Sequence, residues 1–78
     1  MEGADELRRL RWQCRRGLLE LDLLLARFLD RRYPALAVPD QEAFRRLLQE
    51  PDPRLLAWLQ GQERPPEELK NILEILSQ

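Results

Sequence analysis

A stretch of eight residues combines charge and backbone freedom in a way that suits recognition of another molecule. It reads Arg15-Arg16-Gly17-Leu18-Leu19-Glu20-Leu21-Asp22. A glycine inside a helix costs about 0.5–1 kcal/mol relative to alanine, so Gly17 needs a structural reason. We expect a sharp bend that brings the basic segment before it and the acidic segment after it onto one surface. Arginine suits bidentate contacts with carboxylates or phosphates, which favours a recognition role.

The chain lacks the residue types on which most catalytic and metal sites depend. It contains no histidine and a single cysteine, Cys14. This excludes Ser-His-Asp and Cys-His pairs and makes a zinc site very unfavourable. Three scattered glycines cannot form a phosphate-binding loop. We therefore predict that the chain is not an enzyme, with no catalytic residue, no metal site and no stably held cofactor.

The charge is spread unevenly along a chain of 78 residues with a formal net charge of −1. Five arginines and no acid fall in one short basic strip, namely Arg8, Arg9, Arg11, Arg15 and Arg16. From Tyr33 onward there are 5 basic and 8 acidic residues, a net of −3. The basic strip leaves open an alternative function, a small nucleic-acid-binding or antitoxin-like regulator. The net charge and the interspersed acids argue against that alternative.

Length and composition predict one small domain, residues 1–78, in a reducing compartment. A chain of this length leaves no room for a second domain. A lone cysteine gives no internal disulfide, which is typical of the cytoplasm. Apolar runs such as Leu23 to Ala26 are too short to cross a membrane, and the acidic N-terminus does not resemble a signal peptide. We expect a cytoplasmic protein without membrane contact.

The periodicity of apolar residues is helical throughout and predicts an all-α fold of five helices joined by short loops. The first helix is expected over residues 5–15 and the second from about Gly17 to just before Pro34. The apolar stripe of the first helix comprises Leu7, Leu10 and Cys14. That of the second comprises Leu18, Leu21, Leu25, Phe28 and Leu29.

The second half of the chain predicts three further helices. The third begins near Pro39, the fourth at Pro53 with Asp52 as its N-cap and Gly61 as its C-terminal cap, and the fifth at Pro66. Leu36 and Val38 in the preceding loop are expected to pack against the core. The residues expected to face inward are Phe44, Leu47, Leu48, Leu55, Trp58, Leu59, Leu69, Ile72, Leu73 and Leu76.

Four side chains near the glycine need individual interpretation. Trp12 lies opposite the apolar stripe among arginines, so it either packs against another helix or anchors an interface. Glu20 points away from the stripe of the second helix, whereas Asp22 lies at its border and is expected to be paired within the fold. Cys14 is expected to be a buried small hydrophobe.

These residues closely resemble the signature of the FAD assembly factor family SdhE, also called YgfY, which is related to succinate dehydrogenase assembly factor 2. The core motif Arg-Gly-x-x-Glu falls on Arg16, Gly17 and Glu20, together with Trp12, Cys14 and Asp22. Later segments also match, comprising Phe44 to Leu48, Asp52, Leu55, Trp58-Leu59, Gly61 and Glu68-Leu69.

The resemblance implies a small five-helix bundle that promotes covalent attachment of FAD to the flavoprotein subunit of succinate dehydrogenase, and also of fumarate reductase. The FAD would be attached on this client protein, which carries out much of the chemistry itself. Our hypothesis is that the chain binds the immature subunit and holds it in a conformation competent for flavinylation, and we expect the chain to be a monomer when free. Direct binding of FAD by the arginines is a less favoured hypothesis. The predicted partner-binding residues are Arg16, Gly17, Glu20, Arg15, Trp12 and Asp22.

Overall fold

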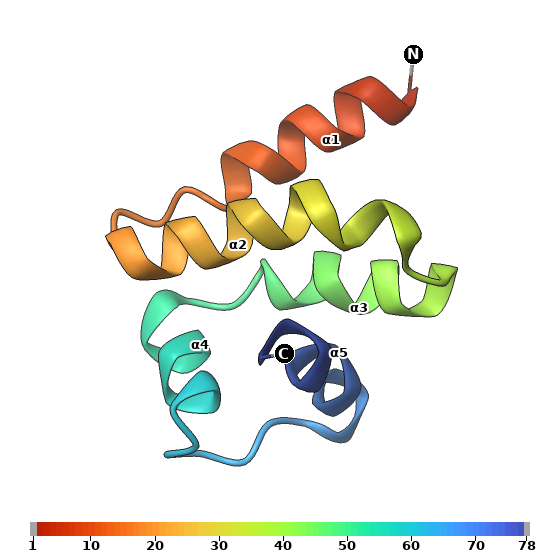
Figure 1. Cartoon of the computed structure of the whole chain (residues 1–78). Coiled ribbons are helices and arrows are strands. Elements are labelled where there is room, and N and C mark those ends of the chain that lie inside the picture. Colours follow the sequence, from red (N-terminus) through yellow and green to blue (C-terminus); the bar gives the residue numbers. More distant parts are fainter. Residues whose placement is uncertain (1, 78) are drawn as a thin grey trace. The chain divides into compact units, whose positions relative to one another are not determined.

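The computed structural model describes residues 2–77 and confirms the predicted all-α fold. Within this range the chain forms five α-helices, one short 3₁₀ helix and no strand (Figure 1). The elements are α1 (Glu2–Gln13), α2 (Leu19–Arg31), η1 (Tyr33–Ala35), α3 (Val38–Leu47), α4 (Asp52–Leu59) and α5 (Glu67–Ser77). In this described part, no helix is long and apolar enough to cross a membrane.

The chain divides into two units, Met1–Ala35 and Leu36–Gln78, here called unit 1 and unit 2. In unit 1, α1 and α2 form an antiparallel hairpin (Figure 1). Arg11 on α1 pairs with Asp30 on α2 at 2.7 Å, and the hydroxyl of Tyr33 donates to Glu6 Oε1 at 3.3 Å. The buried apolar residues of unit 1 are Leu10, Cys14, Leu21, Leu25, Phe28, Leu29 and Tyr33.

The boundaries of the first two helices differ from the prediction by about two residues. α1 ends at Gln13 rather than Arg15, and α2 begins at Leu19 rather than near Gly17. Two residues expected on the apolar stripes are in fact exposed, Leu7 at 39% and Leu18 at 40%. Leu18 is the N-cap of α2 and has extended backbone, so it falls outside the helical face that the period describes.

In unit 2, α5 packs against both α3 and α4. The buried stripe of α5 matches the prediction in full, and Phe44, Leu47 and Leu48 of the α3 segment are also buried. Two polar contacts join α3 to α5 at the surface. Arg46 pairs with Glu68 at 3.3 Å, and the Asn71 side-chain amide donates to Asp40 at 2.9 Å.

Two predictions about the starts of α3 and α4 were wrong. Val38 does not pack inward, since it is the first residue of α3 and is 63% exposed, whereas Leu36 is half-buried. Asp52 is not the N-cap of α4. Pro51 occupies that position, and its carbonyl accepts the N–H groups of Arg54 and Leu55. Asp52 is the first helical residue, where its negative charge still favours the helix dipole.

The end of α4 agrees better with the prediction. Gly61 has φ +75° and follows the C-cap, as expected for a C-terminal glycine. Its N–H bonds the carbonyl of Trp58, and that of Gln62 bonds the carbonyl of Ala57, which is the Schellman arrangement. Trp58 and Leu59 are only half-buried, so of the three inward-facing residues predicted on α4 Leu55 alone is fully buried.

Candidate partner-binding surface

The turn between α1 and α2 has the bend that the glycine predicted. Gly17 adopts φ +83°, a left-handed conformation that L side chains rarely adopt. A Cβ added at Gly17 would meet no atom within 4 Å. The glycine is therefore required by the backbone conformation and not by crowding within the chain. The open space above it leaves room for another molecule to approach the backbone closely.

Asp22 holds this turn in place from the first turn of α2. Its Oδ1 accepts the backbone N–H of Arg16 at 2.6 Å, and its Oδ2 accepts that of Gly17 at 3.3 Å. The N-cap residue Leu18 offers no side-chain hydrogen bond to the helix. A carboxylate that satisfies free backbone N–H groups ahead of a helix acts much like one in a capping box. The expectation that Asp22 is paired within the fold is confirmed.

The two charged residues of the Arg-Gly-x-x-Glu motif lie on different sides of the break in the helix. Arg16 is half-buried, and its Nε donates to the carbonyl of Gln13 at 3.0 Å, at the end of α1. Glu20 lies exposed in the first turn of α2. Because the helix is interrupted between them, the i, i+4 relation of a continuous helix does not apply.

Trp12 is an exposed aromatic residue and not part of the core. Its side chain is 70% exposed, and the Arg15 guanidinium carbon lies 6.0 Å from the ring centroid. This distance is at the limit of a cation–π interaction. Of the two readings of Trp12 that the sequence left open, the structure excludes packing within the core.

Two exposed leucines lie on α2, of which the sequence placed Leu23 on the outer face together with Glu20 and did not single out Leu19. Leu19 is 73% exposed and Leu23 is 53% exposed. The two are four residues apart on α2 and so share a face of the helix. The signal was present in the sequence, because neither residue belongs to the predicted apolar stripe. Two exposed leucines on one helix face, in the same unit as an exposed tryptophan, favour an interaction site.

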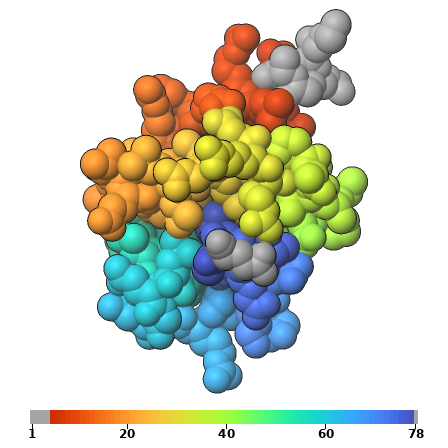
Figure 2. Space-filling view, in the orientation of Figure 1, coloured from red at the N-terminus to blue at the C-terminus, as the bar shows by residue number. Residues whose placement is uncertain are grey.

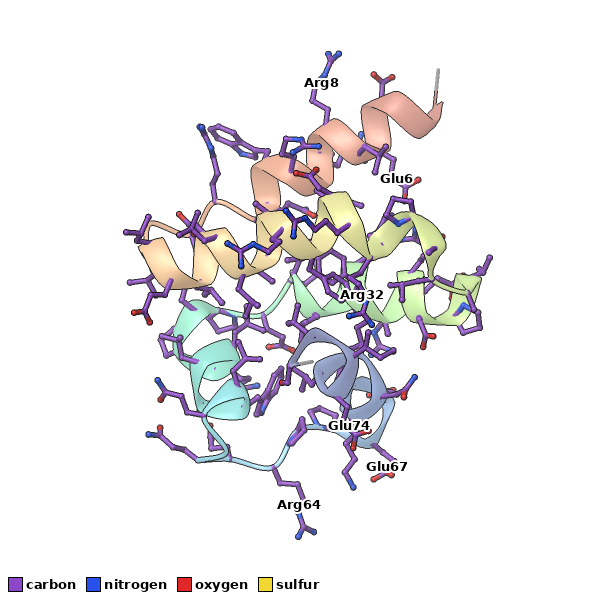
Figure 3. The ribbon with its side chains drawn as sticks, viewed as in Figure 1. Glu6, Arg8, Arg32, Arg64, Glu67 and Glu74 are labelled. Atoms are coloured by element: carbon purple, nitrogen blue, oxygen red, sulfur yellow. The ribbon has the colours of Figure 1, made fainter. Side chains whose placement is uncertain are left out.

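The basic strip is less uniform than its sequence suggested. Arg11 is held by Asp30, and this pairing raises the pKa of Arg11 and lowers that of Asp30. Arg8, by contrast, extends away from α1 (Figure 3). The strip is therefore divided between arginines that support unit 1 and arginines that face outward.

Cys14 is buried at the end of α1, as expected. Burial raises the pKa of its thiol to about 11, although Arg16 and Arg11 partly oppose the shift. A thiol with this pKa is protonated at neutral pH and is a poor nucleophile. In the described part of the chain, no cluster of His, Cys, Asp and Glu residues could hold a metal ion.

Comparison with known proteins identifies the family. The family described as Sdh5, flavinator of succinate dehydrogenase, matches residues 8–78. The chain belongs to this family. The match includes α1 from residue 8 onward, the whole turn described above and all of α2, so the resemblance based on the Arg-Gly-x-x-Glu motif is confirmed. A family of assembly factors agrees with the prediction that the chain is not an enzyme.

Several curated bacterial relatives are similar over most of their length. The chain is 43% identical to the FAD assembly factor SdhE of Coxiella burnetii, over 91% of this chain and 88% of the relative. It is 46% identical to that of Legionella pneumophila strain Paris, over 91% and 90% respectively. It is 42% identical to that of Idiomarina loihiensis, over 96% and 84%. No solved structure matches the chain.

Proposed function

We propose that this chain promotes covalent attachment of FAD to the flavoprotein subunit of succinate dehydrogenase by binding the immature subunit. The flavoprotein subunit of fumarate reductase is a second proposed client. The observation that carries this proposal is that some residues of the α1–α2 turn hold its backbone while others are exposed. Asp22 supports the turn from within, while Trp12, Gly17 and Glu20 are left exposed. The family to which the chain belongs supports the choice of client.

Each exposed group of the turn has a role that follows from its chemistry. Gly17 allows the client backbone to approach, because in the described part of the chain a Cβ added there would meet no atom within 4 Å. Glu20 accepts hydrogen bonds from client N–H or guanidinium groups. Trp12 with Arg15 supplies an aromatic anchor beside this contact, and such residues contribute much of the binding energy in many interfaces. Arg16 pairs with a client carboxylate or carbonyl group.

The assembly factor accelerates flavin attachment by selecting a conformation of the client. FAD supplies the reactive ring and the client supplies the residue that is modified. A helper that binds one client conformation more tightly raises its population in proportion to the difference in affinity. Holding reacting groups in the productive arrangement can lower a barrier by several kcal/mol, on the order of the gains from proximity alone. No residue of this chain needs to take part in bond formation.

Co-expression with the flavoprotein subunit tests the proposal. Gly17→Arg places a large side chain where the client backbone would lie, and Glu20→Ala removes the proposed acceptor. Both variants are expected to lower covalent flavin, measured as in-gel fluorescence of the subunit. Glu42→Ala, which changes an exposed glutamate on α3, is the matched control. Covalent flavin at the wild-type level in both motif variants would refute the proposal.

The proposed function also includes a compartment and an oligomeric state for the protein. We propose that the protein acts in the cytoplasm as a monomer until it meets its client. The nucleic-acid alternative gains no support, because Arg11 pairs with Asp30 and Arg15 lies over Trp12. Direct binding of free FAD gains none either, since no glycine-rich phosphate loop accompanies the arginines.

A further inference from the structure

One side of α2 carries two exposed leucines together with two exposed charges of opposite sign. Leu19 is 73% exposed and Leu23 is 53% exposed. Glu20 and Arg27 are also exposed, and within the described residues neither makes a hydrogen bond or an ion pair. The α2 segment is seen as an orange-to-yellow band in the space-filling view (Figure 2). We call these four residues the α2 outer face.

The α2 outer face points away from the core of unit 1. At about 100° per residue, Leu23 lies about 40° around the helix from Leu19. Glu20 and Arg27 are seven residues apart and lie within about 20° of each other. Both charges therefore stand along one edge of the leucine pair. The buried stripe of α2 lies on the opposite side of the helix and consists of Leu21, Leu25, Phe28 and Leu29.

The charges of the α2 outer face complement a second copy of the same face. When two identical helices pack antiparallel about a two-fold axis, the same edge of each helix meets. Leu23 lies about midway between Glu20 and Arg27 along α2. An axis that passes beside Leu23 therefore places Glu20 of each copy beside Arg27 of the other. Two equivalent ion pairs would then flank a contact made by the leucines.

The other charges of α2 do not oppose this arrangement. Asp30 is held by Arg11 at 2.7 Å, so the two side chains neutralise each other. Asp22 is directed to the backbone of the α1–α2 turn. Arg31 is the last residue of α2 and lies beyond both proposed ion pairs. With Arg11 included, the acids and arginines of α2 are equal in number, so no net charge repels a second copy.

We propose that two copies of this chain associate reversibly through the α2 outer face, packed antiparallel with Leu23 at the centre. Two exposed leucines per copy give a small apolar contact, so the pair belongs to the weak, rapidly exchanging class of interfaces. The ion pairs contribute mainly by fixing the antiparallel register.

Self-association would also limit access to the client-binding surface. The pair covers Glu20, so a second copy and the client compete for it, and the single chain remains the form that acts. This consequence rests on the proposed function. The association itself does not, because it is measured on this chain alone, and either proposal can fail without the other.

Sedimentation equilibrium of the full chain tests the association. Between about 20 μM and 1 mM, a range suited to a weak interface, we expect the average mass to rise with concentration. It should move from the 9.3 kDa of one chain toward twice that value. The mass of a single chain at every concentration would overturn the proposal and leave the α2 outer face to the client or to another partner.

Charge-reversal variants test the antiparallel register. Glu20→Arg and Arg27→Glu are each expected to weaken self-association about tenfold or more, because both cross-pairs become repulsive. An equal mixture of these two variants restores opposite charges at both cross-pairs, so the mixture should associate about as strongly as wild type. Circular dichroism checks that each variant is folded.

Matched variants on unit 2 separate this effect from a change in net charge. Glu74→Arg and Arg64→Glu reverse exposed charges outside the α2 outer face. Each should alter self-association less than about threefold, since exposed charges at a distance are screened by salt. The proposal is overturned if these controls weaken association as much as the α2 variants do. It is also overturned if mixing Glu20→Arg with Arg27→Glu restores no association.

Discussion

The carboxylate of Asp22 accepts the backbone N–H of Arg16 across the break between α1 and α2, at 2.6 Å. The same carboxylate reaches the N–H of Gly17. Asp22 therefore fixes the turn backbone to the beginning of α2, and it is a positioning residue within the predicted partner-binding set. The exposed residues of the turn depend on this bond for their arrangement, because the N-cap residue offers no side-chain bond of its own.

Removing the Asp22 carboxylate should destabilise the turn. We expect Asp22→Ala to lower the free energy of unfolding by about 1–3 kcal/mol, because two backbone N–H groups lose a charged acceptor. Asp22→Asn keeps one acceptor oxygen and should lose roughly half as much. Urea unfolding followed by circular dichroism measures both. Equal stability of wild type and Asp22→Ala would show that the N–H groups are satisfied in another way.

Substitutions at the two glycines with positive φ allow the cost of backbone strain to be measured separately from an effect on partner binding. Gly17 and Gly61 have similar φ values, +83° and +75°, and both have open space where a Cβ would stand. Alanine at either position should cost about 1–2 kcal/mol of folding free energy, and asparagine less, because asparagine tolerates the left-handed region. Unfolding of the four variants measures these costs.

The same glycine variants then report on function. In co-expression, we expect Gly17→Ala to lower covalent flavin more than Gly61→Ala does, at a temperature where both variants remain folded. Gly61 belongs to unit 2 and is not part of the α1–α2 turn, so it controls for stability alone. Equal flavin levels in the two variants would mean that Gly17 serves only the fold.

The sequence predicted the helices well because their apolar spacing is regular. All four residues of the α5 stripe are buried, and a positive φ is found at both glycines named as special. Several of its errors lie at helix ends. At residues 51–53 a proline, an aspartate and a second proline each satisfy a rule for helix starts, and side-chain chemistry alone did not decide which was the cap.

The candidate site was predicted in part. Asp22 was correctly expected to be paired, because a carboxylate at the edge of an apolar stripe rarely remains without a partner in the fold. Periodicity left Trp12 and Leu19 off the predicted apolar stripes without showing whether another helix covers them, and it placed Trp58 inward, although Trp58 is only half-buried. A helical period shows which residues share a face, but which faces are covered depends on how much surface the neighbouring elements supply.

The Arg11–Asp30 pair should make the stability of unit 1 sensitive to acid. The hydrogen bond and charge of Arg11 hold the pKa of Asp30 below its ordinary value of 3.8. A carboxyl whose pKa is lower in the folded state stabilises the fold above its unfolded pKa. That contribution is lost as the pH falls from about 4 through the folded value.

The test of this pair compares wild type with Asp30→Asn. Unfolding free energies at pH 6 and pH 3 should differ more for wild type than for the variant. Because both side chains are exposed, high salt should reduce the difference. A pH dependence that is the same in both proteins would mean that the ion pair adds nothing to folding.

Cys14 should react slowly while the protein is folded and should destabilise the fold at alkaline pH. Burial raises the pKa of its thiol from an ordinary 9.0 to about 11, and the side chain is 2% exposed. An aromatic disulfide reagent at pH 8 should therefore modify Cys14 only after urea unfolds the chain.

The raised pKa of Cys14 also predicts a loss of stability at alkaline pH. Because the folded state retains the thiol proton more tightly than the unfolded state does, the stabilising effect of the protonated thiol is complete below pH 9 and is lost as the pH rises toward 11. Cys14→Ala removes the thiol, so wild type should lose more stability than this variant between pH 8 and pH 10.5, values chosen about the ordinary pKa. Rapid modification of the folded protein at pH 8 would show that α1 opens readily from α2.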